Sequence, residues 1–425
     1  MIVIVGAGLA GLVCARELAR RGVEDWLLLE AETEPGGRVR SAVSPEGFVL
    51  DRGFQVLLDS YPAVRRHVDI AALTPRYLES GAVLHDQGEF WTMADPRRHP
   101  LDLPETVFDA VFPFADKLRL VRLVAELLAT PDDSILAGTA SERDVSTAHF
   151  LWSRGFSPRI TERFFRPFFG GVFLDEKLGT SAALFRYYLK KFATGRALLP
   201  ARGIGEIPRQ LAAGLPAGKL RLGCRIERLE FLGGGADALV TTDDERIAFD
   251  TLLLATDAPA TARLLDRPLR STKAHGTTTI YFSSSAPLYE RAMLTLPAGR
   301  GRLVQHFVQL TNAAPEYAPP GQHLLSATVL DRHGLDDADL FAAARAEIAA
   351  IYPAASSLQP VAIVNVLYAQ HLQPAGFARE LTPAPAPTFL DNVWLAGDQT
   401  AACSIQSAMV SGERSAAFLV QRLAR

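Results

Sequence analysis

Three glycines near the start of the chain have the spacing of a diphosphate-binding turn. Gly6-x-Gly8-x-x-Gly11 lies between a short apolar run and an amphipathic stretch. Gly6 permits a tight turn, Gly8 lets a diphosphate approach the main chain, and Gly11 lets a helix pack closely on a strand. A helix that begins there would direct its free N–H groups and its positive dipole end at the phosphate oxygens. The spacing predicts a nucleotide-binding turn.

The residues around this turn predict a strand, a helix and a second strand. Ile2–Val5 is apolar and β-branched throughout, which is typical of a strand buried on both faces of a parallel sheet. Leu9–Arg21 has apolar residues at helical spacing and ends at Gly22. Trp26–Leu29 is a second apolar strand, and Glu30 follows it. A carboxylate at that strand end can accept hydrogen bonds from ribose hydroxyls.

A second glycine-rich segment, Gly36-Gly37-Arg38, follows the second strand. Its glycines free the main chain, and its guanidinium can face phosphate. Together with GAGLAGL at residues 6–12 and LLLEA at residues 27–31, it resembles the superfamily of FAD-binding amine oxidases, phytoene desaturases and protoporphyrinogen oxidases. In such proteins the second loop contacts the diphosphate of FAD. The resemblance therefore implies an FAD cofactor.

Further segments extend the resemblance along the chain. Asp51–Gln55 is similar to the family segment beside the isoalloxazine ring, and Ile226 falls on the strand that meets the adenine. Ala255-Thr256 resembles the strand end near the adenosine. Gly397-Asp398 and the helix start at Ser404-Ile405 resemble the C-terminal motif, in which the acid holds ribityl or phosphate oxygens and the helix N-terminus points at the flavin pyrimidine. The predicted cofactor-binding residues are Gly6, Ala7, Gly8, Leu9, Ala10, Gly11, Glu30, Ala31, Gly36, Gly37, Arg38, Gly53, Phe54, Gln55, Ile226, Ala255, Thr256, Gly397, Asp398, Ser404 and Ile405.

The length and the order of elements predict two interleaved domains. The chain has 425 residues, and one domain takes about 100–200 residues. We expect an α/β fold, in which a Rossmann-like FAD-binding domain of the glutathione-reductase and amine-oxidase type alternates with an α+β substrate domain. The substrate domain should contain an antiparallel sheet and a helical part. The predicted FAD-binding domain comprises residues 1–75, 196–268 and 388–425, and the substrate domain comprises residues 76–195 and 269–387.

Composition narrows the class of protein. A net charge of −3 disfavours a nucleic-acid partner, which usually selects a basic face. Cys14, Cys224 and Cys403 form no CxxC pair and the histidines are scattered, so we predict no metal site and a reducing, cytoplasmic compartment. A run of about 18 uncharged apolar residues, as a transmembrane helix needs, does not occur in the sequence.

The substrate is predicted from departures within the C-terminal half. Amine oxidases of this superfamily have a tyrosine in the C-terminal motif and a lysine near flavin N5. Here Ser404 and Thr277–Thr279 fall at the comparable positions, which disfavours simple amine oxidation. The motif is closer to the desaturase branch, whose substrates are isoprenoid hydrocarbons. We therefore expect hydride transfer from a small apolar, isoprenoid-like substrate to N5, with the protein supplying orientation.

Other functions stay open at this point. The chain could be an amine oxidase, or a flavoprotein without net redox turnover, such as a carotenoid isomerase or a sugar mutase. A binding protein similar to the Rab GDP-dissociation inhibitors, which share the fold and hold no FAD, is disfavoured by the intact glycine loops and Glu30. The sequence identifies no catalytic side chain, and it leaves the electron acceptor, covalent attachment of the FAD and the oligomeric state open.

The segment Phe164–Phe173 is unusually rich in aromatic residues. It could form a pocket wall, or a peripheral contact with a membrane surface, because exposed aromatic patches often mark such surfaces. A buried helix and turn would need the same residues.

Overall fold

The first elements of the chain form a parallel sheet covered by helices. The computed structural model describes residues 1–94, 97–98, 111–137, 144–232, 235–269, 272–299, 301–377 and 385–423. β1 (Ile2–Val5) lies between β2 (Trp26–Leu29) and β14 (Thr251–Leu254), with parallel register to both. The strand order is β10-β2-β1-β14-β21-β20, in which only the edge strand β20 is antiparallel. The remaining strands are β10 (Leu220–Arg221), β20 (Ala386–Pro387) and β21 (Val393–Leu395).

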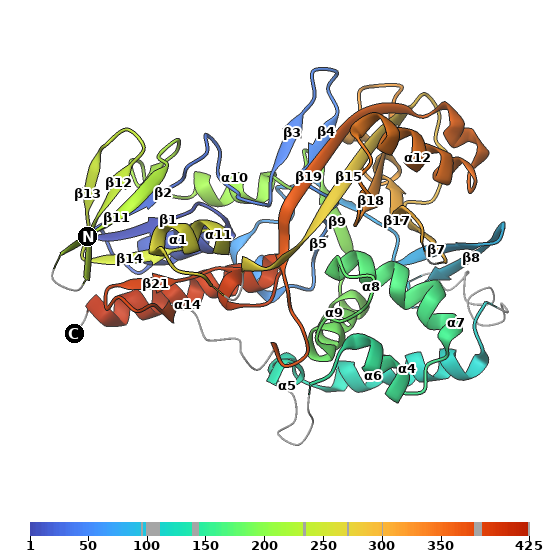
Figure 1. The fold of residues 1–425 in the computed structure, drawn as a ribbon, viewed down its shortest axis with the longest axis horizontal. Helices are drawn as coiled ribbons and strands as arrows, with labels where there is room; N and C mark the ends of the chain where they lie inside the picture. Colours follow the sequence, from blue (N-terminus) through green and yellow to red (C-terminus); the bar gives the residue numbers. More distant parts are fainter. Residues whose placement is uncertain are drawn as a thin grey trace.

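This sheet combines three separated pieces of the chain, residues 2–29, 220–254 and 386–395. α1 (Leu9–Arg20) and α14 (Ile405–Leu423) lie side by side on it, although they come from opposite ends of the sequence (Figure 1). α2 (Pro62–His67) and α10 (Glu206–Ala213) pack against these two helices. The assignment of domain boundaries to residues 75, 195, 268 and 387 stays a prediction. A small antiparallel sheet of β11 (Ile226–Leu232), β12 (Gly235–Thr241) and β13 (Arg246–Ala248), and helix α11 (Ala258–Leu265), complete this unit.

The second unit of the fold is built on a seven-stranded mixed sheet with the strand order β19-β15-β18-β17-β16-β7-β8. One face of its central strands, including Ile280 and Phe282, packs against α12 (Asp337–Ala349). The alternate residues Thr277, Thr279 and Tyr281 therefore point to the opposite face, because successive strand residues alternate. The strands are β7 (Gly81–Asp86), β8 (Glu89–Ala94), β15 (Ala274–Ser284), β16 (Leu294–Pro297), β17 (Val304–Gln309), β18 (His323–Val329) and β19 (Gln359–His371).

A helical part packs below this sheet in Figure 1 and has a core rich in aromatic side chains. A π-helical turn, Thr161–Phe165, joins two of its helices and carries Phe164 and Phe165 into the core. Among the described residues, every helix is too short or too polar to cross a bilayer. The helices are α4 (Phe114–Ala129), α5 (Asp132–Ala137), α6 (Thr147–Ser153), α7 (Pro158–Ile160), α8 (Arg166–Phe173) and α9 (Ala182–Thr194).

Several short strands and one carboxylate connect the parallel-sheet unit with the seven-stranded sheet. Asp51 ends β4 (Val49–Asp51) and is fully buried. Its Oδ1 accepts hydrogen bonds from Ser41 Oγ (2.5 Å) and Ile204 N (2.9 Å), and its Oδ2 accepts from Tyr317 Oη (2.9 Å). Tyr281 Oη of β15 donates to the Asp51 carbonyl (2.8 Å). The remaining short strands are β3 (Ser41–Val43), β5 (Leu57–Leu58), β6 (Pro75–Tyr77) and β9 (Ala197–Pro200).

Replacing Asp51 by asparagine should remove one pH dependence of stability. Burial raises the pKa of Asp51 from 3.8 to about 6, and this outweighs the hydrogen bonds from Ser41, Ile204 and Tyr317, which act to lower it. A raised folded-state pKa means that the protonated form favours folding, so this contribution is present below about pH 4 and is lost as the pH rises through 6. The loss amounts to about 3 kcal/mol.

Thermal unfolding of Asp51→Asn and the unmodified protein at pH 5 and pH 7.5 measures this effect. We expect the melting temperature of the unmodified protein to rise relative to that of the variant as the pH falls. An offset between the two proteins that is the same at both pH values would contradict the assignment.

Candidate cofactor and substrate site

One cavity connects the glycine turn at the start of α1 with the apolar side of α4. Its volume is about 1370 Å³. Because ligand pockets commonly hold roughly 300–1,000 Å³, the cavity has room for a dinucleotide and a further molecule. The predicted residues that line it are Gly6, Gly8, Leu9, Ala10, Glu30, Ala31, Gly36, Gly37, Arg38, Gly53, Phe54, Gln55, Ile226, Ala255, Thr256, Gly397, Asp398, Ser404 and Ile405. Ala7 and Gly11 lie behind this wall.

The three glycines of the turn are required for different reasons. Gly6 has φ +104°, and a Cβ there would lie 2.8 Å from the Ala255 carbonyl oxygen. A Cβ on Gly11 would lie 2.0 Å from the Gly6 carbonyl oxygen, so this glycine allows α1 to touch β1. Gly8 caps α1 with an extended backbone, and a Cβ there would meet nothing within 4 Å. Gly8 therefore faces open space, where a diphosphate would lie against the first N–H groups of the helix.

Glu30 holds the turn through its carboxylate. It is buried at the end of β2, and its Oε2 accepts a hydrogen bond from Ala7 N (2.7 Å). Its Oε1 accepts from Glu32 N (3.0 Å). Each oxygen has a second lone pair, so hydrogen bonds from a ribose remain compatible with these two. The carbonyl oxygen of Ala7 accepts from Gly36 N (2.8 Å), and this joins the two glycine loops. Ala7 thus acts through its main chain and is kept out of the cavity.

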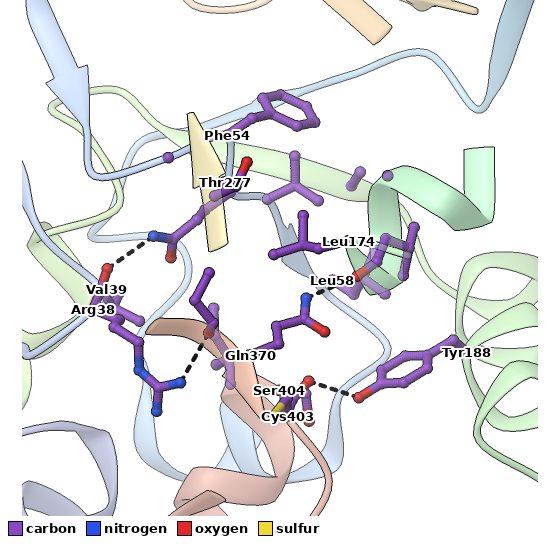
Figure 2. Close-up of a pocket in the computed structure, with 18 of the residues that line it drawn as sticks. Arg38, Val39, Phe54, Leu58, Leu174, Tyr188, Thr277, Gln370, Cys403 and Ser404 are labelled. Carbon is purple, nitrogen blue, oxygen red and sulfur yellow. Dashed lines mark hydrogen bonds between the residues drawn. The ribbon is translucent and has the colours of Figure 1, made fainter. Parts of the chain in front are cut away.

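Arg38 pairs with Asp398 rather than projecting alone into the cavity. The distance from Arg38 Nη2 to Asp398 Oδ2 is 2.6 Å, and Nη1 donates to the Ala369 carbonyl of β19 (2.9 Å; Figure 2). Burial would lower the pKa of Arg38, but the Asp398 carboxylate raises it overall. The pKa of Asp398 is correspondingly held below its usual range by Arg38, against the effect of burial. Both groups are therefore charged, and both line the cavity.

The fold brings one histidine and one cysteine to this ion pair, although the sequence shows them as scattered. One ligand-type atom from each of His371, Asp398 and Cys403 lies within 4.8 Å of the others, and Cys403 Sγ is 3.1 Å from His371 Nδ1. Burial and the nearby Asp398 raise the pKa of the Cys403 thiol, so it stays protonated. Arg38 already neutralises Asp398. These charges fit an ion-paired cluster, and the predicted lack of a metal stays a prediction.

The N-terminus of α14 faces the same end of the cavity. Gly397 has φ +101°, and its N donates to Ser411 Oγ (2.8 Å), which fixes the turn before Asp398. Ser404 accepts from Ser407 N (3.0 Å) and so caps α14. A Cβ on Gly412 would lie 2.4 Å from the Ala10 carbonyl oxygen, so α14 touches α1 directly. The free N–H groups at this helix start can stabilise negative charge on a flavin pyrimidine.

Several residues in the middle of the cavity were not identified by the sequence. Gln370 of β19 donates to the Val172 carbonyl (2.8 Å), and Tyr188 of α9 donates to the Cys403 carbonyl (2.8 Å). Figure 2 shows Gln370 between Arg38 and Tyr188, with Ser404 below it and with Phe54 and Thr277 on the other side of the same space. These residues come from elements that are far apart in the sequence, and no local pattern marks them. Gln370 can be recognised as a cavity residue only once β19 is paired with β15 in the folded chain.

Gln55 has an internal role. Its Nε2 donates to the carbonyls of Arg38 (2.8 Å) and Arg52 (2.9 Å), so the amide ties the loop after β4 to the second glycine loop. The neighbouring Phe54 ring lines the cavity. Ile226 also lines the cavity, and its carbonyl accepts a hydrogen bond from Arg263 Nη2 (3.2 Å). Thr256 Oγ1 lies 2.7 Å from Thr261 Oγ1. Ile226 and Thr256 therefore line one cavity together with Phe54 and Gln55, and the cofactor parts assigned to them stay predictions.

The aromatic segment forms a pocket wall and part of the core. Phe164, Phe168 and Phe169 line the cavity, and Phe165 and Phe173 are buried behind them. Their rings pack edge to face or stacked on one another, for example Phe168 against Phe169 at 5.1 Å. A membrane contact through the buried rings of this segment is therefore wrong, because they cannot reach a surface.

Comparisons with known proteins agree with this geometry. Residues 9–419 match the family described as flavin containing amine oxidoreductase. The phytoene dehydrogenase of Streptomyces griseus is 27% identical over 371 residues, which cover 76% of this chain and 71% of that protein.

Solved structures with the same fold include enzymes of different activity. Putrescine oxidase bound to putrescine matches with a TM-score of 0.72 and 18% identity over 99% of both chains. A reduced UDP-galactopyranose mutase matches with a TM-score of 0.72 and 17% identity over 100% of this chain and 94% of that one. At such identities the likeness establishes the fold. The match over residues 9–419, on a chain whose glycine loops, Glu30 and α14 surround one cavity, shows that this protein belongs to the flavin-containing amine oxidoreductase family and is an FAD-dependent oxidoreductase.

Proposed function

We propose that this enzyme oxidises an apolar, isoprenoid-like substrate by hydride transfer to the N5 atom of FAD. The observation that carries the proposal is the apolar half of the cavity, whose walls come from α4, the π-helical turn, α8 and α9. Its side chains include Leu120, Val124, Phe164, Phe168 and Phe192. Such walls favour a hydrocarbon, because burial of apolar surface is stabilising and a charged amine there would lose its hydration.

The polar half of the cavity would hold the FAD. Bound FAD would supply the two-electron acceptor, and the protein would supply position and charge. The turn at Gly8 and the start of α1 would hold the diphosphate, and Glu30 would accept from a ribose. Arg38 and Asp398 would orient the ribityl and phosphate groups, and the start of α14 at Ile405 would face the pyrimidine.

The side chains near the middle of the cavity support the desaturase type over the amine oxidase type. Thr277 of β15 and Ser404 at the start of α14 both line the cavity. The resemblance places the amine oxidases' lysine on the strand of Thr277–Thr279 and their tyrosine at Ser404. Neither hydroxyl can replace an ammonium group or an aromatic ring. Amine oxidation stays the alternative, together with an isomerase that needs reduced flavin without net turnover.

Gly8→Val should abolish FAD retention while the protein stays folded. Gly8 has φ −72°, which valine can adopt, and its Cβ would extend into open space, so the isopropyl group would occupy the diphosphate position. We expect the purified variant to carry less than a tenth of the FAD of the unmodified protein. FAD released on denaturation, measured by absorbance per protein chain, checks this.

The control for this experiment is Ala346→Val, which places the same isopropyl side chain at an exposed position of α12 outside the cavity. Its FAD content should be unchanged. Gly11→Val is unsuitable, because its Cβ would overlap the Gly6 carbonyl and disturb the fold. A Gly8→Val protein with its full complement of FAD would refute the proposed cofactor site.

Anaerobic mixing of the FAD-loaded enzyme with phytoene or with putrescine distinguishes the substrate classes. We expect phytoene, delivered in detergent micelles, to bleach the visible flavin absorbance, and putrescine to leave it unchanged. Bleaching by putrescine and not by phytoene would establish the amine oxidase alternative. Conversion of a substrate to an isomer by pre-reduced enzyme, with no change in flavin absorbance, would establish the isomerase.

We further propose that an apolar stripe on α4 contacts a membrane surface from which the substrate enters. Phe114, Leu118, Val121 and Leu128 are exposed and recur at intervals that place them on one face of the helix. Val121 and Leu128 also line the cavity, so the stripe is continuous with its apolar half. Lys117 and Arg122 flank the stripe, which suits anionic headgroups.

Leu118→Asp should weaken binding of the enzyme to vesicles of phosphatidylcholine and phosphatidylglycerol. The side chain is 60% exposed and does not line the cavity, so the change leaves the site intact. Losing one inserted leucine costs about 1.5–3 kcal/mol, so cosedimentation should show at least a tenfold loss. Val43→Asp, an exposed apolar residue on β3, is the matched control. Equal binding of both variants and the unmodified protein would contradict the contact.

A further inference from the structure

His306 is a buried imidazole in the wall of the cavity. It lies on β17, its side chain is 5% exposed, and it lines the cavity beside the Phe54 ring, whose centroid is 5.3 Å away in an edge-to-face arrangement. On its other side, α8 approaches so closely that a Cβ on Gly171 would lie 2.5 Å from His306 Nδ1. The glycine in the aromatic segment therefore makes room for this ring.

The imidazole has no hydrogen-bond partner within the described part of the chain. Both Nδ1 and Nε2 are buried and unpaired. Burial lowers the pKa of His306 to about 4, so the ring is neutral near pH 7 and has one donor and one acceptor nitrogen. Buried polar groups without partners are rare because they cost free energy, unless a ligand or water completes them.

Thr328, on the neighbouring strand β18, places a second polar group beside His306. His306 is paired with Thr328 of β18, and Thr328 lines the cavity with a buried Oγ1 that has no partner among the described residues. Thr279 of β15 lies opposite Thr328, and its Oγ1 is also buried and unpaired. Three neighbouring strands thus present unsatisfied neutral polar atoms, in a sheet whose opposite face is an apolar core.

We propose that His306 and Thr328 bind a neutral oxygen-bearing group, a hydroxyl or a carbonyl, on an otherwise apolar substrate. This inference rests on the proposed apolar substrate and specifies its polar end. The imidazole N–H donates to the oxygen of the group, and the Thr328 hydroxyl supplies a second hydrogen bond as donor or acceptor. The group would bind beside Phe54, which belongs to the segment that the family resemblance places next to the isoalloxazine ring. A cation gains little there, since the imidazole and the hydroxyls carry no charge.

Binding of 1-octanol and n-octane to the FAD-loaded enzyme tests this proposal. Both probes are volatile, so their affinities follow from headspace partitioning above the protein solution. His306→Leu and Thr328→Val remove the polar atoms at similar volume. We expect each variant to bind 1-octanol about tenfold more weakly than the unmodified enzyme, as expected for a lost buried hydrogen bond. Octane affinity should be unchanged or slightly higher.

Thr295→Val is the matched control, because Thr295 is equally buried in the same sheet and lies outside the cavity. FAD content and melting temperature establish that each variant is folded. Unchanged octanol affinity in both His306→Leu and Thr328→Val, with octane still bound, would overturn the role of this pair and leave the apolar cavity standing. Failure of the unmodified enzyme to bind either probe would overturn the proposed apolar substrate itself.

Discussion

The start of α1 is fixed by main-chain contacts that leave no room for a methyl group. Gly11 lies against the Gly6 carbonyl, Gly412 against the Ala10 carbonyl, and Gly6 against the Ala255 carbonyl. The turn is therefore held by β1, by α14 and by the end of β14 at once. Overpacking at any of these points costs about 1–3 kcal/mol or more. The N–H groups that would meet a diphosphate owe their direction to this packing.

The rest of the cavity is arranged around two kinds of environment. At the end near α1, each charged group has a fixed partner. Arg38 forms an ion pair with Asp398, and the Glu30 carboxylate accepts hydrogen bonds from main-chain N–H groups. Removing one partner of such a pair is costly, because the other would be left desolvated. At the end near α4, aliphatic and aromatic side chains form most of the wall. A redox centre that meets both ends can hold a charged cofactor and an uncharged substrate in contact.

The sequence predicts the first of these environments far better than the second. Gly6, Gly8, Gly11 and Glu30 act through local geometry, so their spacing alone identifies the turn and its strand–helix–strand unit. The parallel sheet and the antiparallel strands at β15, β17 and β18 follow from their hydrophobic patterns. The pairing of Arg38 with Asp398 depends on how the last helix packs, which no spacing in the sequence reveals.

The apolar end and its polar atoms depend on contacts between distant segments. His306 and Thr328 look like ordinary alternating strand residues, and only the register of β17 with β18 brings them together at the cavity. The aromatic segment fits three interpretations, because a segment whose rings line a pocket and a segment whose rings fill a core have the same amino-acid composition. Burial of Phe165 and Phe173 decides between them. Sequence patterns indicate which residues are buried, whereas the packing of the elements determines which atoms those residues contact.

The contact of α14 with α1 has a consequence for the newly made chain. Residues 1–21 are synthesised well before residues 405–423, yet Gly412 must meet Ala10 before the turn is closed on all sides. Until residues 405–423 have been synthesised and have packed, one face of α1 is therefore uncovered in the nascent polypeptide. Apolar surface that is exposed in this way during folding is prone to aggregation, so early packing of α14 onto α1 would protect the folding chain.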